Sequence, residues 1–567
     1  MTHLNHYNQD LGKCPANYQA LTPLLFLKRS AEVFPDKVAI VHGSIRVTYQ
    51  EFYARARSLA SALTINLNIK PGNTVSVLLA NTPPMLECHY GIPMTGAVIH
   101  SINTRLDASA IAFQLQHSLS KVVIVDTEYL DVLKDALKQL NMVLPSIIVY
   151  QDPELYPLEQ NVTKYEYEQL LANGDPLFHW AAPITEWDAI SINYTSGTTG
   201  NPKGVVSHHR GAYLLAQGNI LTLSMHRFDV YLWTLPMFHC NGWGFPWSLS
   251  LIAGTHVCLR RVRADAIFDA IVSEKVSMLC GAPAVMSTIV EFNPSDAQTF
   301  RHPVTFCTAA APPPPPILEK MNQKGFKVTH LYGLTETYGP AVVNEWKPEW
   351  NQLDSESSLT LTARQGVRYH ALEDLKVLDS VSMKEVPHDG ETLGEVMFRG
   401  NIVMKGYFRN PQATADSFKD NWFHSGDLAV VCPDGYIQLK DRSKDIIISG
   451  GENISSIEIE DVLYRCKGVR LAAVIAVPNE KWGEVPCAFV ELHTDSNLNT
   501  IALADWCKQH LAKYKTPKYF YIQQIPVTAT GKIRKVDLRE SFRADKIGTI
   551  EKPESTGEQL TQKNLPK

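Results

Sequence analysis

Short β-rich runs alternate with helical patterns between residues 25 and 330. Stretches such as 54–67 and 129–140 have helical periodicity, and they separate apolar runs at 74–80, 121–126, 145–150, 189–195, 276–282, 304–310 and 327–333. This alternation predicts parallel sheets with helical crossovers, and ligands bind beyond the carboxyl ends of such strands. We therefore expect an α/β fold with a large N-terminal domain of parallel-type sheets.

The pattern changes twice after this region. Strands without long helices, such as 393–400 and 435–441, predict a β-rich subdomain, and a helix–strand–helix–strand series follows residue 445. A chain of 567 residues is long enough for more than one core. We expect an N-terminal domain over 1–440, a boundary at 441–445, a small α+β C-terminal domain over 446–540 and a disordered tail over 541–567.

The composition excludes several classes of protein. A net charge of −5 gives no electrostatic reason to expect nucleic acid as a partner. The ten cysteines follow no ligand spacing, which is typical of buried thiols in a reducing compartment. Because we find no long uncharged apolar stretch, no signal-like start and no SKL-type ending, we expect a cytoplasmic protein without stable membrane insertion.

The stretch YTSGTTGNPKG, residues 194–204, combines small residues with one lysine directly after a β-type run. It fails the P-loop pattern GxxxxGK[ST], because Pro202 replaces the second glycine and Gly204 follows Lys203. Small residues still let backbone N–H groups approach phosphate oxygens, and Lys203 adds a positive charge. A flexible linker is the alternative, and the apolar run that leads into the stretch opposes it.

YTSGTTGNPKG resembles the phosphate-binding loop of the adenylate-forming superfamily, which includes acyl-CoA synthetases, adenylation domains of peptide synthetases and firefly luciferase. Further segments stand in the superfamily's order: PMFHCNGW (236–243), AAAPPP (309–314), YGLTETYG (332–339), HSGDLA (424–429), KDRSKDIIISGGENISS (440–456) and TGKIRK (530–535). The resemblance covers residues 20 to 540. It is nearest to the acyl-activating branch with plant benzoyl- and short-chain acyl-CoA ligases and the bacterial methylmercaptopropionate-CoA ligase.

The resemblance implies a site for ATP and Mg²⁺. Glu336 is expected to bind Mg²⁺, a hard cation that needs oxygen ligands, and Tyr332 to stack near adenine. Asp427 and Arg442 are expected to reach the ribose hydroxyls. The expected nucleotide site comprises Thr195, Ser196, Gly197, Thr198, Thr199, Gly200, Lys203, Ala310, Ala311, Pro312, Tyr332, Gly333, Asp427 and Arg442.

The resemblance also implies two half-reactions and a mobile C-terminal domain. Lys532 matches the lysine that bridges the substrate carboxylate and the α-phosphate during adenylation. The domain is then expected to rotate about Lys444 in the 441–445 hinge, so that Gly450 and Gly451 approach the pantetheine arm of CoA. The expected catalytic residues are Lys203, Thr335, Glu336 and Lys532.

Other positions bear on the acid and on CoA. His239 stands where peptide synthetases carry an aspartate for the α-amino group, so an amino acid is disfavoured. Ala309 replaces the glycine of related aryl ligases, which favours a short or medium acid. A basic patch of Arg260, Arg261 and Arg263 is either a CoA-phosphate contact or a solvated face. The expected acyl pocket comprises His239, Trp243, Ala309, Gly333, Gly339 and Pro340.

The resulting prediction is an AMP-forming acid-CoA ligase that uses ATP, Mg²⁺ and CoA on a short- to medium-chain acid. Transfer to a carrier protein in trans and an aryl or longer-chain acid are the alternatives within the superfamily. A P-loop kinase and a catalytically inactive binding protein are the rival classes. A homodimer is left open.

Overall fold

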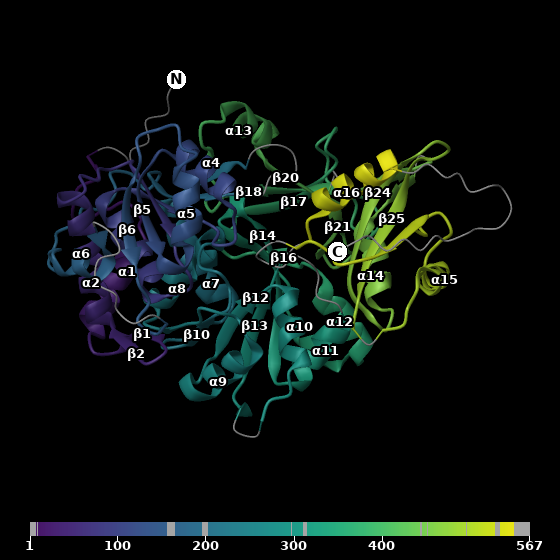
Figure 1. Ribbon diagram of the computed structural model, residues 1–567, viewed down its shortest axis with the longest axis horizontal. Coiled ribbons are helices and arrows are strands. Elements are labelled where there is room, and N and C mark those ends of the chain that lie inside the picture. The colour runs from purple at the N-terminus through teal and green to yellow at the C-terminus, as the bar shows by residue number, and fades with distance from the viewer. Residues whose placement is uncertain are drawn as a thin grey trace.

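The computed structural model describes residues 7, 10–155, 165–195, 202–295, 298–309, 315–442, 445–450, 452–494, 496–527 and 533–548. Within these residues, the chain forms two large sheets, an antiparallel sheet and a C-terminal sheet, and the C-terminal sheet lies at one end of the long axis of the molecule (Figure 1).

The first large sheet has the strand order β16-β15-β14-β13-β12-β10-β11-β1-β2. Its strands from β14 to β1 are parallel, whereas β2, β15 and β16 pair antiparallel at the two edges. The bounds are β1 (Val38–His42), β2 (Ile45–Thr48), β10 (Val230–Trp233), β11 (Thr255–Cys258), β12 (Met278–Gly281), β13 (Val304–Thr308), β14 (Phe326–Leu334), β15 (Gly339–Val343) and β16 (Val367–Arg368).

The second large sheet has the order β19-β9-β8-β4-β3-β5-β6-β7. It is parallel from β7 to β8, and β9 and β19 extend it antiparallel. The Val- and Ile-rich runs of β3 and β5 are buried, as expected for parallel strands covered on both faces. The bounds are β3 (Thr74–Leu78), β4 (Val98–Ser101), β5 (Ser120–Asp126), β6 (Ser146–Tyr150), β7 (Tyr165–Glu166), β8 (Ala189–Tyr194), β9 (Gly204–His208) and β19 (Gly406–Tyr407).

Helices connect the parallel strands and pack on the sheets (Figure 1). One hydrophobic cluster includes Ile40 of the first sheet, Val75 of the second and Phe52 of α2, so the two sheets share a core. A capping box between Thr48 and Glu51 begins α2. The bounds are α1 (Leu24–Val33), α2 (Tyr49–Ile65), α3 (Pro83–Gly91), α4 (Ala108–Ser118), α5 (Leu130–Leu137), α6 (Tyr167–Ala172), α7 (His209–Thr222), α8 (Phe245–Leu251), α9 (Ala264–Glu274), α10 (Pro283–Glu291), α11 (Pro315–Gln323) and α12 (Ser355–Ala363).

The β-rich subdomain is an antiparallel sheet in the order β17-β18-β20-β21. Its strands are β17 (Asp374–Leu378), β18 (Gly394–Arg399), β20 (Phe423–Val431) and β21 (Ile437–Arg442), and α13 (Pro411–Ser417) lies between β19 and β20 in the chain. This sheet brings the HSGDLA segment and the first two residues of DRSKD, Asp441 and Arg442, onto neighbouring strands.

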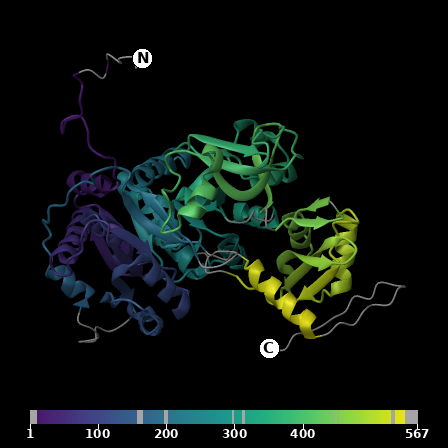
Figure 2. The same cartoon turned by 90° about the horizontal axis from the view of Figure 1, so that it is seen from above.

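The C-terminal sheet contains β22 (Ile447–Ser449), β23 (Glu452–Ile454), β24 (Val469–Asn479), β25 (Gly483–Leu492) and β26 (Tyr519–Ile522), with α14 (Ser456–Tyr464), α15 (Thr500–His510) and α16 (Lys535–Gly548). Figure 2 shows this unit as a lobe beside the rest of the chain. The expected fold class is therefore confirmed. Among the helices of the described residues, none has the length and apolar character needed to span a membrane.

Candidate active site

The strands on both sides of the phosphate-loop segment are joined in an antiparallel pair. Tyr194 of β8 lies opposite Gly204 of β9, and the N–H of Thr195 donates to the carbonyl of Lys203 at 3.1 Å. A side chain at Gly204 would meet the terminal methyl of Ile192 at 2.9 Å, so the Ile192 side chain would have to shift to accept one. Thr195 and Lys203 therefore lie side by side at the end of β8, and Ser196, Gly197, Thr198, Thr199 and Gly200 lie outside the described residues.

Tyr407 joins Lys203 to Glu336. The ammonium of Lys203 lies 4.5 Å from the centre of the Tyr407 ring, and the Tyr407 hydroxyl donates to Oε1 of Glu336 at 2.8 Å. Glu336 belongs to the short helical turn η6 (Thr335–Thr337) after β14, and its carbonyl accepts from the N–H of Met404 at 2.7 Å. Two expected catalytic residues thus meet through a tyrosine that sequence reasoning missed.

The environment of Glu336 suits a hard cation. Burial raises the pKa of Glu336, and the hydrogen bond from Tyr407 partly opposes that rise. The ion pairs found among the described residues do not include Glu336, and those residues contain no cluster of three His, Cys, Asp or Glu side chains that could hold a metal alone. A lone carboxylate fits Mg²⁺ that completes its shell with phosphate oxygens and water. Mg²⁺ bound there would neutralise phosphate charge.

Asp427, which is expected to reach the ribose, is held between two partners. Asp427 on β20 and Arg442 on β21 are cross-strand neighbours, and Nε of Arg442 lies 3.2 Å from Oδ1 of Asp427. The Tyr332 hydroxyl donates to Oδ2 of Asp427 at 2.7 Å. Each carboxylate oxygen keeps a second lone pair, so Asp427 can still accept from a ribose hydroxyl. The Tyr332 contact was not predicted, because only the ring of Tyr332 was given a role.

The expected acyl residues meet where η4 (His239–Gly244) packs against the turn between β14 and β15. A side chain at Gly339 would meet Cα of Trp243 at 3.1 Å, and Gly339 has φ +142°. Gly333 lies opposite Pro340, and a side chain at Gly333 would meet the Gly339 carbonyl oxygen at 2.0 Å. These contacts place Trp243, Gly333, Gly339 and Pro340 together.

His239 and Ala309 lie on segments that border this cluster. Cys240, next to His239, has its Sγ 3.5 Å from Oγ1 of Thr335, which links η4 to the Glu336 turn. Ala309 follows β13 and packs against the core that contains Trp243. Ala310, Ala311 and Pro312 lie outside the described residues.

The backbone of η4 is left-handed over several consecutive residues. Cys240, Asn241 and Trp243 have φ between +41° and +53°, in a region that side chains disfavour. The amide of Asn219 donates to the Trp243 carbonyl at 2.9 Å, and the amide of Asn241 donates to Oγ of Ser101 at 2.9 Å. These bonds from α7 and β4 hold the turn in this conformation.

The C-terminal lobe carries part of the expected CoA face. Gly450 has φ +61°, its N–H donates to the Trp482 carbonyl at 2.8 Å, and a side chain there would meet the Trp482 ring at 2.8 Å. Gly450 therefore needs to be glycine for packing on Trp482, which is 45% exposed. Lys444, Gly451 and Lys532 lie outside the described residues.

Both alternatives for the basic patch, a CoA-phosphate contact and a solvated face, fail for Arg260. Its guanidinium is 7% exposed and pairs with Asp126 at 2.7 Å, Glu128 at 2.6 Å and Asp152 at 3.0 Å. Arg263 is exposed but pairs with its neighbour Asp265. The carboxylates come from β5, from the short turn η3 (Thr127–Tyr129) after it and from the segment after β6, which the local sequence around Arg260 does not reveal.

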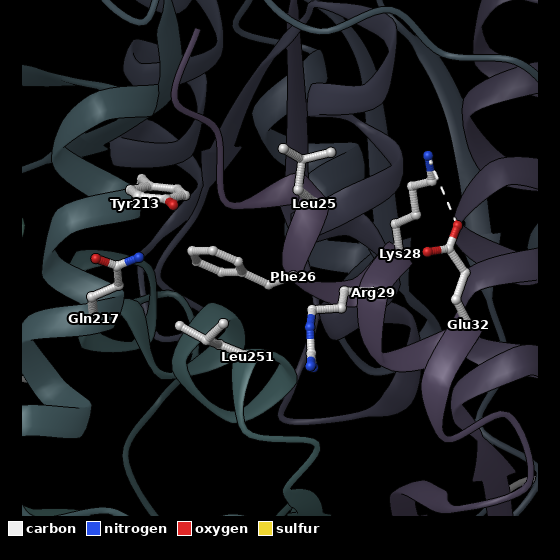
Figure 3. A pocket seen from close by; sticks show the side chains of 8 residues that line it. All are labelled: Leu25, Phe26, Lys28, Arg29, Glu32, Tyr213, Gln217 and Leu251. Carbon is white, nitrogen blue, oxygen red and sulfur yellow. Dashed lines mark ion pairs between the residues drawn. The ribbon is translucent and has the colours of Figure 1, made fainter. Parts of the chain in front are cut away.

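A surface pocket of about 350 Å³ lies apart from these residues. It is lined by Leu25, Phe26, Lys28, Arg29, Glu32, Tyr213, Gln217 and Leu251, from α1, α7 and α8 (Figure 3). On α7, Tyr213 and Gln217 face away from Leu215 and Asn219, the residues that contact Gly339 and Trp243, because positions two apart on a helix point in nearly opposite directions. The pocket is therefore outside the candidate active site.

The fold and these segments define an adenylate-forming enzyme, and the chain belongs to the AMP-binding enzyme family. The family model described as AMP-binding enzyme matches residues 27–408, and the model described as AMP-binding enzyme C-terminal domain matches residues 458–532. Within this family the chain is an AMP-forming acyl-CoA synthetase, a class that uses ATP, Mg²⁺ and CoA.

Particular relatives cover nearly the whole chain. A peroxisomal acetate/butyrate–CoA ligase of Arabidopsis thaliana is 48% identical over 95% of this chain and 97% of its own length. An acetate–CoA ligase of Humulus lupulus is 48% identical over 96% and 98%. Among solved structures, the O-succinylbenzoate coenzyme A synthetase of Bacillus subtilis in complex with ATP and magnesium ion is 26% identical, with a TM-score of 0.76 over 91% of this chain and 99% of that chain.

Proposed function

We propose that the chain joins a short- to medium-chain carboxylic acid to CoA. The observation that supports this proposal is that buried aromatic rings fill the space beside the expected acyl-pocket residues. Trp247 and Tyr338 are 0% and 1% exposed and stack with ring centres 5.6 Å apart, and Trp243 is 7% exposed. A long acyl chain would have to displace these rings, whereas a short one would not. The names of the relatives, which specify acetate and butyrate, support the same choice.

The proposed roles of the residues follow the charge that the reaction develops. The acid's carboxylate attacks the α-phosphorus of ATP, which forms an acyl-adenylate and releases pyrophosphate; a thiol then attacks the acyl carbon and releases AMP. Lys203 and Thr335 would hold phosphate oxygens, Glu336 would hold Mg²⁺, and Lys532 would stabilise the charge where the new bond forms. Asp427 and Arg442 would fix the ribose.

The proposal also divides the chain at residues 441–445. The N-terminal domain would comprise residues 1–440 and the C-terminal domain residues 446–540, with rotation about Lys444 between the half-reactions. Helix α16 continues past residue 540 to Gly548, and Phe542 packs in the C-terminal core, so residues 541–548 belong to this domain and not to the expected tail. Two hydrogen bonds cross this boundary, from the start of α14 to the end of β21, and the proposed rotation would break them. The N–H of Ser456 donates to Oδ2 of Asp441 at 2.6 Å, and the Ser455 hydroxyl donates to the Lys440 carbonyl.

The acid is tested by CoA-dependent AMP release from ATP. The panel contains straight-chain acids of 2 to 16 carbons, benzoate, cinnamate and methylmercaptopropionate. We expect the highest kcat/KM for a short or medium acid, and Trp243→Ala should shift the optimum toward longer chains, because it removes a ring from the pocket wall. A maximum at the long-chain or aryl acids would contradict the proposed acid, and release of ADP would contradict the reaction.

Two further properties belong to the proposal. We propose a cytoplasmic location, which a fluorescent fusion tests against the peroxisomal location in the name of the Arabidopsis thaliana relative. We also propose a homodimer, which light scattering of the purified enzyme tests directly.

A further inference from the structure

Tyr407 lies between Lys203 and Glu336, two oppositely charged residues that are both proposed to bind MgATP. Its ring faces the Lys203 ammonium at 4.5 Å, and its hydroxyl donates to Glu336 at 2.8 Å. Tyr407 is 9% exposed, so the ring is a fixed part of the wall rather than a surface side chain. The ion pairs of the described residues include neither Lys203 nor Glu336. The tyrosine is thus the partner that these two residues share.

The backbone around Tyr407 is held on both sides. Tyr407 on β19 lies opposite Val205 on β9, the strand that leaves the phosphate-loop segment. The N–H of Phe408 donates to the Gly204 carbonyl at 2.7 Å, and the N–H of Tyr407 donates to Oγ1 of Thr414 at 2.9 Å. Strand β19 therefore sets the ring in register with Val205, two residues after Lys203.

We infer that Tyr407 is a positioning residue that keeps Glu336 and Lys203 apart and oriented for MgATP before the nucleotide binds. This inference rests on the proposed roles of Glu336 and Lys203. Opposite charges in a partly buried site attract one another strongly, and a direct Lys203–Glu336 pair would have to be broken before each could bind its own part of MgATP. The ring of Tyr407 lies against the Lys203 ammonium, and its hydroxyl bonds to the Glu336 carboxylate. The two charged groups are thus kept from pairing directly, and each keeps its charge.

The hydroxyl and the ring have separable effects. Tyr407→Phe removes the donor to Glu336 and keeps the ring under Lys203, so it should weaken binding only when Mg²⁺ is present. Tyr407→Leu removes both features, so it should also weaken binding of the metal-free nucleotide. A purely structural role would weaken both forms of the nucleotide equally in both variants.

The experiment is calorimetric titration of the full-length enzyme with α,β-methylene-ATP, which cannot form an adenylate, in Mg²⁺ and in EDTA. We expect Tyr407→Phe to raise Kd about 10-fold in Mg²⁺, the effect of losing one hydrogen bond to a charged group, and less than about twofold in EDTA. Partial unfolding lowers the binding stoichiometry rather than Kd. Tyr436→Phe is the matched control, because it removes a hydroxyl that donates to the Glu345 carbonyl at 2.6 Å, and it should leave both Kd values unchanged.

Glu336→Gln and Lys203→Ala separate the inference from the function on which it rests. Glu336→Gln should reproduce the Mg²⁺-specific loss, and the double variant with Tyr407→Phe should be no weaker than Glu336→Gln alone. If Glu336→Gln and Lys203→Ala leave binding unchanged, the proposed roles fail. If those variants weaken binding but Tyr407→Phe does not, or if the double variant is additive, the positioning role of Tyr407 is overturned.

Discussion

At the scale of single residues, the site depends on side chains whose partners are far apart in the sequence. Asp427 contacts Tyr332, a residue 95 positions earlier in the chain, as well as its cross-strand neighbour Arg442. The hydroxyl of Tyr332 and the guanidinium of Arg442 fix the direction of both carboxylate oxygens. The carboxylate is therefore oriented before a ribose arrives, which lowers the entropy lost on binding.

Asp427→Asn should weaken ATP binding, because an amide offers one acceptor oxygen in place of two. We expect KM for ATP in pyrophosphate exchange to rise about 10-fold, with a smaller change in the rate at saturating ATP. Asp374→Asn is the matched control, since it removes a carboxylate that pairs with Arg399 on the exposed part of the same sheet. If the two substitutions raise KM for ATP equally, Asp427 stabilises the β-rich subdomain and does not contact the nucleotide.

At the scale of elements, the segment between β21 and β22 carries the proposed rotation. Contacts beside it join β21 to α14, and α16 is tied to α14 through Lys535, which lies 2.8 Å from Glu460 and donates to Oγ of Ser456 at 2.6 Å. The bonds from α14 to Lys440 and Asp441 cross the boundary, whereas those of Lys535 remain within the lobe. Rotation would therefore break the first set and keep the second.

Lys444→Pro should separate the two half-reactions, because proline restricts the dihedral angles that the rotation must change. Pyrophosphate exchange should stay within about twofold of the parent enzyme, while thioester formation should fall about 100-fold or more. Lys444→Ala keeps the backbone free and should retain both activities. Parallel loss of both half-reactions in the proline variant would refute the hinge at this residue.

At the scale of the whole molecule, several histidines are buried in the neutral form. Burial lowers the pKa of His89, His208, His209 and His330 to about 4, and that of His100 and His256 to about 3. In the unfolded chain these residues bind protons near pH 6.5. The unfolded state therefore binds more protons below that pH, and the free energy of unfolding decreases as the pH falls from 6.5 toward 4.

The thermal midpoint should accordingly fall between pH 7 and pH 5. His330 hydrogen-bonds through Nδ1 to the Arg364 carbonyl at 2.9 Å, and an asparagine at this position can donate similarly without titrating. His330→Asn should reduce the pH dependence of the free energy of unfolding by at most one proton. His388→Asn, at a site where the side chain is 49% exposed, is the control and should leave the slope unchanged. An unchanged slope in His330→Asn would contradict the proposed origin of the acid sensitivity.

The sequence predicted the helices and strands better than it predicted which of them lie next to one another. The apolar runs at 121–126 and 145–150 became β5 and β6 almost residue for residue, because strand periodicity is local. The pairing of β19 with β9 joins segments about 200 residues apart, so Tyr407 carried no local sign of its contact with Glu336. The charge run at 260–263 gave no local sign that Arg260 is buried, since the carboxylates that pair with it come from β5, from the turn after β5 and from the segment after β6.

The left-handed turn of η4 links the wall of the proposed acyl pocket to the stability of the core. Each non-glycine residue in that conformation costs about 1–2 kcal/mol, and the hydrogen bonds from Asn219 and Asn241 offset part of that cost. The same Asn219 side chain also donates to Oγ of Ser248 and accepts from the buried Tyr369 hydroxyl. Loss of Asn219 would therefore release the turn beside the proposed acyl pocket and leave a buried hydroxyl without its acceptor, so acid selectivity and core stability would be lost together.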